Sequence, residues 1–181
     1  MRTLMISTAA ALALLVPATA TAHSFSVGTR AATCYSASLN FGIKPGAVDD
    51  CTAALDQEPL SFADRIATYV NRGIIRMNMG DHAGADRDFD TAIQLDANEP
   101  EAWLNKGLLR LRQDRPGDAM PLIQRSIDAH TIRPALALYA RGVAHEELGH
   151  LNAAYSDLSQ ARDLAPNWKL PAEQLARYHV R

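Results

Sequence analysis

A spacing of about 34 residues recurs through the middle of the chain and constrains its fold more than any other feature. Three columns of residues keep this spacing: a glycine, an alanine at a constant offset after it, and a large residue one helical turn before it. The columns are Gly73, Gly107 and Gly142; Ala85, Ala119 and Ala154; and Tyr69, Trp103 and Leu138. Three columns in one register predict an internal repeat.

Each repeat is predicted to be a hairpin of two helices. Turn-forming residues divide the units near their middle, at Gly80-Asp81, Arg115-Pro116-Gly117 and Gly149-His150. The stretches on either side are about 13 to 16 residues long, which is the length of helices and not of strands. In the stretch after Gly80, Phe89 and Ile93 fall on one helical stripe, whereas Asp86 and Asp90 face away from it.

The small residues of the columns explain why such hairpins would stack. A Gly or Ala on each helix lets two backbones approach closely, and the large residues fill the remaining space. A single hairpin cannot bury its apolar face alone, so neighbouring hairpins must pack against one another. We therefore predict an all-α protein, an α-solenoid of three antiparallel helical hairpins at about residues 66–99, 100–134 and 135–168.

Two flanking segments are predicted to cap this array. The segment "AVDDCTAALDQ", residues 47–57, has the spacing of a second helix without its first. Residues 23–62 are therefore assigned to an N-terminal segment with one capping helix. At the other end "PAEQLARYHVR" predicts a short C-terminal helix with Pro171 at its first position, so repeats and cap occupy residues 63–181.

Residues 1–22 are predicted to be a secretory signal peptide. Arg2 precedes an apolar run from Leu4 to Val16, and Ala20-Thr21-Ala22 has the pattern of a cleavage site. This run is shorter than the ~20 residues of a membrane-spanning helix, although a retained anchor is the alternative. We expect an exported protein, in a bacterial periplasm, without membrane insertion after the signal is removed.

The two cysteines, Cys34 and Cys51, are predicted to form a disulfide. A lone pair of cysteines in one region of an exported protein most simply indicates such a bond. The alternative is a metal or redox pair. The separation of these cysteines, with no nearby histidine, matches no familiar metal spacing, and no Cys-x-x-Cys is present.

Neither charge nor motifs indicate a nucleic-acid ligand or a catalytic site. The formal net charge is −2, so nothing steers the protein to nucleic acid or to an anionic membrane. The sequence contains no Gly-x-Ser-x-Gly elbow, no glycine-rich phosphate loop and no Cys-x-x-Cys-His haem attachment. We therefore expect no enzymatic activity and no cofactor.

Two segments resemble metal motifs without their spacing. In "HEELGH", His145 and His150 are five residues apart, whereas a zinc-protease helix needs four so that both imidazoles share a face. "DRDFD" begins like a calcium loop, but Thr91 and Ala97 stand where that loop needs glycine and glutamate. We interpret both as ordinary helix and turn, and we predict no metal site.

Taken together, these residues resemble the tetratricopeptide repeat family over roughly residues 66–166. Beyond the three columns, the family's turn glycine is matched by Gly80 and Gly149, and its final proline by Pro166. Its later aromatic is matched by Phe89, whereas Asp114 replaces the turn glycine of the middle unit. The resemblance implies a superhelix whose first helices line a concave groove, and a role in protein–protein binding.

The resemblance also nominates residues that line this groove. They are Asn71, Ile74, Met77, Glu101, Leu104, Asn105, Leu108, Leu111, Tyr139 and Val143. In peptide-binding members, an Asn at the position of Asn71 and Asn105 hydrogen-bonds the backbone of an extended ligand, because its amide both donates and accepts. A carboxylate clamp of the family's design would need basic residues where Glu101, Leu136 and Ala140 stand.

The basic residue before the packing glycine is predicted to have a structural role. The offset from Arg72 to Asp88 equals the offset from Arg141 to Asp157, and each aspartate falls on the partner helix of the same hairpin. The common offset predicts an Arg–Asp contact within each of these hairpins. In the middle unit the same offset places Lys106 opposite Leu122, so we expect no such pair there.

The predicted function is that of a non-catalytic adaptor, scaffold or assembly factor. Its partner would be a protein or peptide of unknown identity, bound in an aliphatic groove with two amides. The alternative is a self-associating structural protein, or an accessory subunit of an enzyme complex. In that case the groove would be filled by the chain itself, for example by the segment before the first helix, or by a second copy.

Overall fold

The computed structural model describes residues 29–40 and 44–178, and these form nine helices and no strand. The helices are α1 (Arg30–Leu39), α2 (Ala47–Gln57), α3 (Phe62–Asn78), α4 (His82–Leu95), α5 (Pro100–Arg112), α6 (Pro116–Asp128), α7 (Pro134–Glu147), α8 (Leu151–Leu164) and α9 (Lys169–Leu175). The predicted all-α class is confirmed. The predicted signal peptide, residues 1–22, lies outside the described residues. No helix in the described part is both long and apolar enough to span a membrane.

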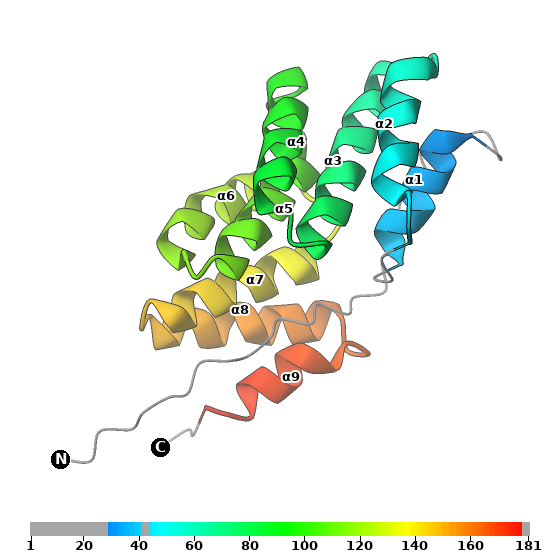
Figure 1. Cartoon of the computed structure of the whole chain (residues 1–181). Helices are drawn as coiled ribbons and strands as arrows, with labels where there is room; N and C mark the ends of the chain where they lie inside the picture. The colour runs from blue at the N-terminus through cyan, green and yellow to red at the C-terminus, as the bar shows by residue number, and fades with distance from the viewer. Residues whose placement is uncertain (1–28, 41–43, 179–181) are drawn as a thin grey trace.

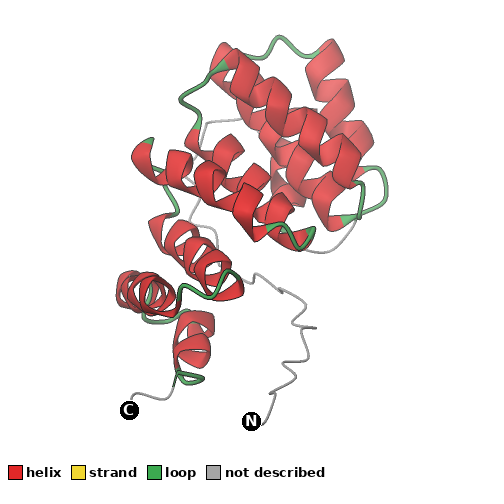
Figure 2. Ribbon diagram, turned by 90° about the vertical axis from the view of Figure 1, so that its left-hand side faces the viewer, coloured by secondary structure: helices red, strands yellow, loops and turns green. Residues whose placement is uncertain are grey.

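Consecutive helices pack as antiparallel hairpins, and each hairpin packs against the next. The hairpins α3–α4, α5–α6 and α7–α8 follow one another in chain order, with α1–α2 before them and α9 after them (Figure 1). Figure 2 shows the helices joined by short loops, and in Figure 1 the last hairpin, α7–α8, lies across the direction of α3. The array is therefore a solenoid that turns as it proceeds.

Local sequence signals set the ends of the helices. Ser61 caps α3 by accepting a hydrogen bond from the Asp64 backbone N–H at 3.1 Å, and prolines begin α5, α6 and α7. The turns inside the first and third hairpins use glycine with positive φ, 81° at Gly80 and 79° at Gly149. Asp114 adopts the same left-handed region with φ 54°, so the middle hairpin turns without its glycine.

A glycine faces a large side chain at the centre of each of the three hairpins. Gly73 faces Phe89, and a Cβ added to Gly73 would lie 2.5 Å from the Phe89 Cε1 atom. The same contact joins Gly107 to Ile123 and Gly142 to Leu158. All three large side chains are fully buried. The glycine column therefore marks the closest approach of the two helices, as its spacing predicted.

One buried polar residue interrupts the alanine column of the second helices. Ser126 stands where the other two hairpins have Ala92 and Ala161. It is fully buried, and its hydroxyl has no hydrogen-bond partner among the described residues. A buried hydroxyl without a partner carries its full desolvation cost.

We expect Ser126→Ala to stabilise the protein by about 1 kcal/mol, because it removes this cost and loses no hydrogen bond. Urea unfolding followed by circular dichroism measures the change in the free energy of unfolding. Ser156→Ala on the exposed side of α8 is the matched control, with a change within about 0.5 kcal/mol. Destabilisation by Ser126→Ala would mean that the hydroxyl makes a contact that the structure lacks.

The N-terminal cap is a complete hairpin and not the single helix that the sequence predicted. Helix α1 precedes α2 and packs against both α2 and α3. Its buried residues are Ala31, Cys34 and Ser38, which are all small. The buried face of this helix therefore lacks the stripe of large apolar residues that would have indicated a helix.

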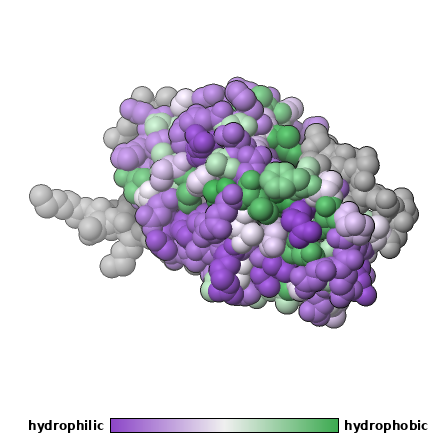
Figure 3. Space-filling view, turned by 90° about the horizontal axis from the view of Figure 1, so that it is seen from above, coloured by the Kyte–Doolittle hydropathy of each residue, from purple (hydrophilic) through white to green (hydrophobic). Residues whose placement is uncertain are grey.

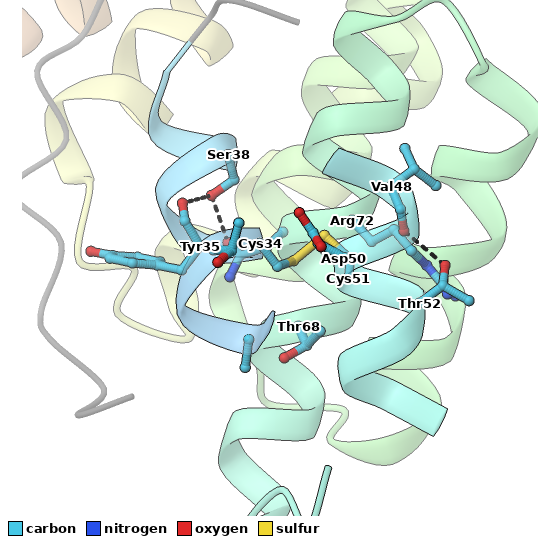
Figure 4. Close-up of a disulfide and its surroundings, with 12 residues drawn as sticks. Cys34, Tyr35, Ser38, Val48, Asp50, Cys51, Thr52, Thr68 and Arg72 are labelled. Carbon is cyan, nitrogen blue, oxygen red and sulfur yellow. Dashed lines mark hydrogen bonds between the residues drawn. A yellow bond between two sulfur atoms is a disulfide. The ribbon is translucent and has the colours of Figure 1, made fainter. Parts of the chain in front are cut away.

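The predicted disulfide joins Cys34 of α1 to Cys51 of α2, with a Cα–Cα distance of 4.8 Å (Figure 4). Cys51 lies four residues after Ala47 and three before Ala54. The same distances separate Phe89 from the alanines that flank it. In the α1–α2 hairpin the disulfide thus occupies the position that the contact between a glycine and a large side chain occupies in the other three hairpins.

Reduction of the disulfide is expected to lower the free energy of unfolding by about 3 kcal/mol, as for a loop of this size. Besides the disulfide and its packing on α2 and α3, α1 is held by hydrogen bonds. Glu58 accepts from the backbone N–H groups of Arg30 and Ala31, at 2.7 and 3.3 Å, and Asn71 accepts from the Ser38 hydroxyl. Denaturant unfolding with and without reductant measures the loss. Hydrogen exchange should show faster exchange of α1 amides in the reduced protein, with α5 to α8 unchanged as the internal control.

The C-terminal cap is α9, which packs against α8. It begins at Lys169, so Pro171 is the third residue of the helix and not the first, as the sequence predicted. Trp168, just before α9, packs on Tyr139 of α7 with ring centroids 4.8 Å apart. Gln174 also donates a hydrogen bond to Glu146 of α7. The cap therefore contacts both helices of the third hairpin.

Candidate interaction surface

The residues nominated for the groove all lie on the first helices α3, α5 and α7, and α5 contacts both α3 and α7. Most of them, however, are buried in the described chain. The buried members are Asn71, Met77, Leu104, Asn105, Leu108, Leu111, Tyr139 and Val143. Ile74 and Glu101 are half-buried. Contacts between neighbouring hairpins thus use most of the apolar surface assigned to the groove.

The two asparagines are engaged within the chain. Asn71 is 8% exposed, and its Oδ1 accepts a hydrogen bond of 3.0 Å from the Ser38 hydroxyl of α1. Asn105 is 3% exposed, and its Nδ2 donates to the Glu101 carbonyl at 2.7 Å. A peptide could reach these amides only after displacing these contacts. Their role as ligand contacts stays a prediction.

Glu101 anchors the loop between the second and third hairpins. Its carboxylate accepts hydrogen bonds from the Thr131 hydroxyl and from the Ile132 backbone N–H, the latter at 3.1 Å. Arg133 donates to the same carboxylate from Nε at 2.6 Å. The half-buried Glu101 therefore has a structural role that its position on the first helix did not reveal.

Both Arg–Asp pairs predicted from the common offset are present. The Arg72 guanidinium contacts the Asp88 carboxylate at 2.8 Å, and Arg76 contacts the same carboxylate at 2.7 Å. Arg141 donates to both oxygens of Asp157 at 2.7 Å. In the first hairpin two arginines share one aspartate, and in the third hairpin one arginine binds both oxygens of an aspartate. These contacts connect the two helices of the first hairpin and those of the third.

In the middle hairpin, Lys106 pairs with acidic residues of the preceding hairpin and not with the partner helix of its own hairpin. Lys106 of α5 reaches back to α4 of the preceding hairpin, where it pairs with Asp90 and lies 3.5 Å from Asp86. Arg110 also contacts Asp86, at 2.8 Å. Burial raises the pKa of Asp86, but the two cations together outweigh it and hold that pKa below its usual value. These contacts connect two hairpins.

Arg112, at the end of α5, was not singled out by the sequence pattern. Its Nη1 donates to the Asn78 side chain at 2.9 Å and to the Met77 carbonyl at 3.4 Å, both on α3. In the described part of the chain its guanidinium has no carboxylate partner, unlike Arg110 one turn earlier. Burial lowers the pKa of Arg112. The Arg112 guanidinium thus lies beside the C-terminal end of α3, where its hydrogen-bond acceptors among the described residues are neutral.

The two segments that resemble metal motifs lie where the sequence interpretation placed them, in helix and turn. Asp86, Asp88 and Asp90 all lie within α4 and pair with cations. His145 lies near the end of α7, and His150 is the N-cap of α8. Among the described residues, no group of three or more His, Cys, Asp or Glu lies close enough to hold a metal ion.

Exposed apolar side chains remain at several places on the array. In the face shown in Figure 3, apolar residues gather in a band between polar margins. At the turn between α7 and α8, Leu148, Leu151 and Tyr155 are all exposed. Tyr155 also makes an edge contact with Tyr178, with ring centroids 5.8 Å apart.

The fold and its packing columns define the class of protein, a solenoid of stacked antiparallel helical hairpins. Residues 66–99 match the family model of the tetratricopeptide repeat, so the chain carries this repeat, as its sequence predicted. The search of curated proteins finds no match.

Solved structures of MamA share the fold. One crystal structure of MamA is 21% identical with a TM-score of 0.59, covering 72% of this chain and 73% of that one. MamA 41-end from Desulfovibrio magneticus RS-1 is 23% identical with a TM-score of 0.63, covering 82% of each chain. The MamA RS-1 ArsTM double mutant gives the same values. At these identities the likeness concerns the fold alone.

Proposed function

We propose that this protein is a non-catalytic interaction module, an adaptor or scaffold that binds a protein or peptide segment along the first helices of its repeats. The proposal rests on one observation above all: α5 contacts both α3 and α7, so these helices form one continuous face. Solenoids use such extended faces for binding. The tetratricopeptide match supports the same role. Export to a bacterial periplasm is part of the proposal and rests on residues 1–22.

The accessible residues of this face are the ones that we expect to meet a partner. Ile74 is half-buried, and Asn78 and Arg112 lie together at the ends of α3 and α5. Arg112 offers a guanidinium with no carboxylate partner in the described chain, so it suits an acidic side chain or a C-terminal carboxylate. The buried Asn71 and Asn105 would then stabilise the helices of this face through their hydrogen bonds within the chain and would not contact the partner.

Site-specific photocrosslinking in the native compartment tests the proposal. A photoreactive amino acid at Ile74 or Arg112 is expected to give a discrete protein adduct. The same amino acid at Gln94, exposed on α4, is the matched control and should give none. Equal adducts from all three positions, or none from the first two, would contradict binding along the first helices.

A second candidate is that the chain itself, or a second copy, fills this face. Two contacts favour it, because in each a segment outside the three hairpins packs on a residue of this face. The Ser38 hydroxyl of α1 donates a hydrogen bond to Asn71, and Trp168 of the C-terminal cap packs on Tyr139. Light scattering after size-exclusion chromatography distinguishes the two candidates. A concentration-independent monomer mass, together with adducts at Ile74, supports an external partner; a stable dimer without such adducts supports self-association.

A further inference from the structure

The third hairpin exposes apolar side chains at positions that are covered in the other two hairpins. One such position directly follows the column alanines Ala85, Ala119 and Ala154. In the first hairpin it is Asp86, which contacts Lys106 and Arg110 of the next hairpin. In the second it is Met120, which packs against a core that includes residues of α7. Both are half-buried, whereas Tyr155 of the third hairpin is 43% exposed.

The first residue of each second helix follows the same pattern. His82 and Pro116 begin α4 and α6 and are half-buried, whereas Leu151 begins α8 and is 55% exposed. Helix α9 packs on α8 where the first helix of a further hairpin would lie (Figure 1), but it has 7 residues, whereas α5 and α7 have 13 and 14. Beyond α9, the ring of Tyr178 meets the ring of Tyr155. The start of α8 therefore remains uncovered in the described part of the chain.

The charges beside this uncovered surface are negative. Glu147 ends α7 directly before the exposed Leu148, and Asp114 lies in the turn between α5 and α6. Burial raises the pKa of the Glu147 carboxyl, and the negative charges of Asp114 and Glu146 raise it further. Glu146 is paired with Arg177 at 3.3 Å. Glu147 and Asp114, in contrast, form no ion pair with any residue in the described part of the chain.

The basic groups nearest in sequence to this surface are already engaged. Arg115, which follows Asp114, pairs with Asp118 at 2.6 Å. The Nδ1 atom of His150, in the turn before α8, lies 3.4 Å from the Nδ1 atom of His145. Two carboxylates beside exposed apolar side chains thus have no counter-charge among the described residues. This combination suits a partner that is both apolar and basic.

We propose that this end of the array binds a basic amphipathic helix of a partner protein. The surface consists of Leu148, Leu151 and Tyr155 with the carboxylates of Glu147 and Asp114. The partner helix packs across the start of α8, as the first helix of a further hairpin would. Its apolar stripe covers Leu151 and Tyr155, and a Lys or Arg beside that stripe pairs with Glu147. The surface lies on a turn and a second helix, so it is a second docking site in addition to the first-helix face.

The test is a selection of peptide ligands for the purified protein from a displayed library. Its peptides are about 18 residues long, which allows a helix, with a fixed apolar stripe and flanking positions that vary among Lys, Glu and Gln. We expect the selected peptides to be enriched in Lys over Glu. Glu147→Lys should abolish this enrichment. Asp163→Lys, at an exposed position near the other end of α8, is the matched control and should leave it unchanged.

The affinity of a selected Lys-rich peptide, measured by fluorescence anisotropy, locates its site. Leu151→Ser is expected to weaken binding by about tenfold or more. Phe62→Ser, which changes an exposed apolar residue at the start of α3, is the matched control with unchanged affinity. Failure to select any peptide would overturn the proposal, and so would a selection without preference for Lys. Unchanged affinity in Leu151→Ser would also overturn it, because the peptide would then bind another surface.

Photocrosslinking in the native compartment distinguishes the possible occupants of this surface. A photoreactive amino acid at Leu151 is expected to form an adduct with a partner protein, and mass spectrometry should place the crosslink in a basic amphipathic helix of that partner. A crosslink to the chain's own C-terminal residues, or to a second copy of the chain, would overturn the proposal. Neither result bears on adducts at Ile74 or Arg112, so the first-helix face is tested separately.

Discussion

Replacing Asp88 by Asn is expected to lower the free energy of unfolding by about 3–5 kcal/mol, the range for breaking a buried ion pair. The Asp88 side chain is only 3% exposed, and its carboxylate contacts Arg72 and Arg76 together. Without that charge, two largely buried guanidinium groups lie close together. Among the described residues, only the half-exposed Asp81, 3.7 Å from Arg76, then remains to offset them. Denaturant unfolding measures the loss.

Two comparisons separate this effect from general damage. Asp163→Asn removes an exposed partner of Arg162 and should cost at most about 1 kcal/mol. In the third hairpin, Arg141→Asp combined with Asp157→Arg should recover much of the stability that either single reversal loses. Additive losses in that double variant would contradict a direct pairing.

The pairs inside hairpins could be predicted from the sequence, and the pairs between hairpins could not. The offset from Arg72 to Asp88 is set by the geometry of one hairpin, so it repeats with the hairpin. The contact of Lys106 with Asp90 depends on how one hairpin is rotated on the next. That rotation comes from the packing of many side chains, and no single column of residues encodes it.

The candidate face shows the same division. Family positions placed its residues on the correct helices, since helical periodicity fixes which side chains share a face. Burial could not be predicted in this way, because it depends on segments that the columns do not cover. Helix α1 covers Asn71, yet its buried residues are small and carry no periodic apolar signal. Cys34, paired with Cys51, was the one sign that this segment packs here.

The contact between Gly73 and Phe89 is expected to show the largest effect of core packing. Phe89 is fully buried, so Phe89→Ala should lower the free energy of unfolding by about 3–5 kcal/mol. Gly73→Ala should cost about 1–3 kcal/mol, because its new Cβ overlaps the Phe89 ring. For this net loss, the cost of the overlap between the new Cβ and the Phe89 ring must exceed the stabilisation of about 1 kcal/mol that alanine gives a helix relative to glycine.

The two changes together distinguish a packing contact from a requirement for glycine itself. In the Phe89→Ala protein, Gly73→Ala should become neutral or stabilising, because the ring that it overlaps is gone. Gly117→Ala in α6 is the matched control: a Cβ there meets nothing within 4 Å, so alanine should not destabilise. Urea unfolding of the four proteins of the cycle and of the control gives these energies. An equal cost of Gly73→Ala with and without the ring would mean that backbone conformation, and not the approach of α3 to α4, requires this glycine column.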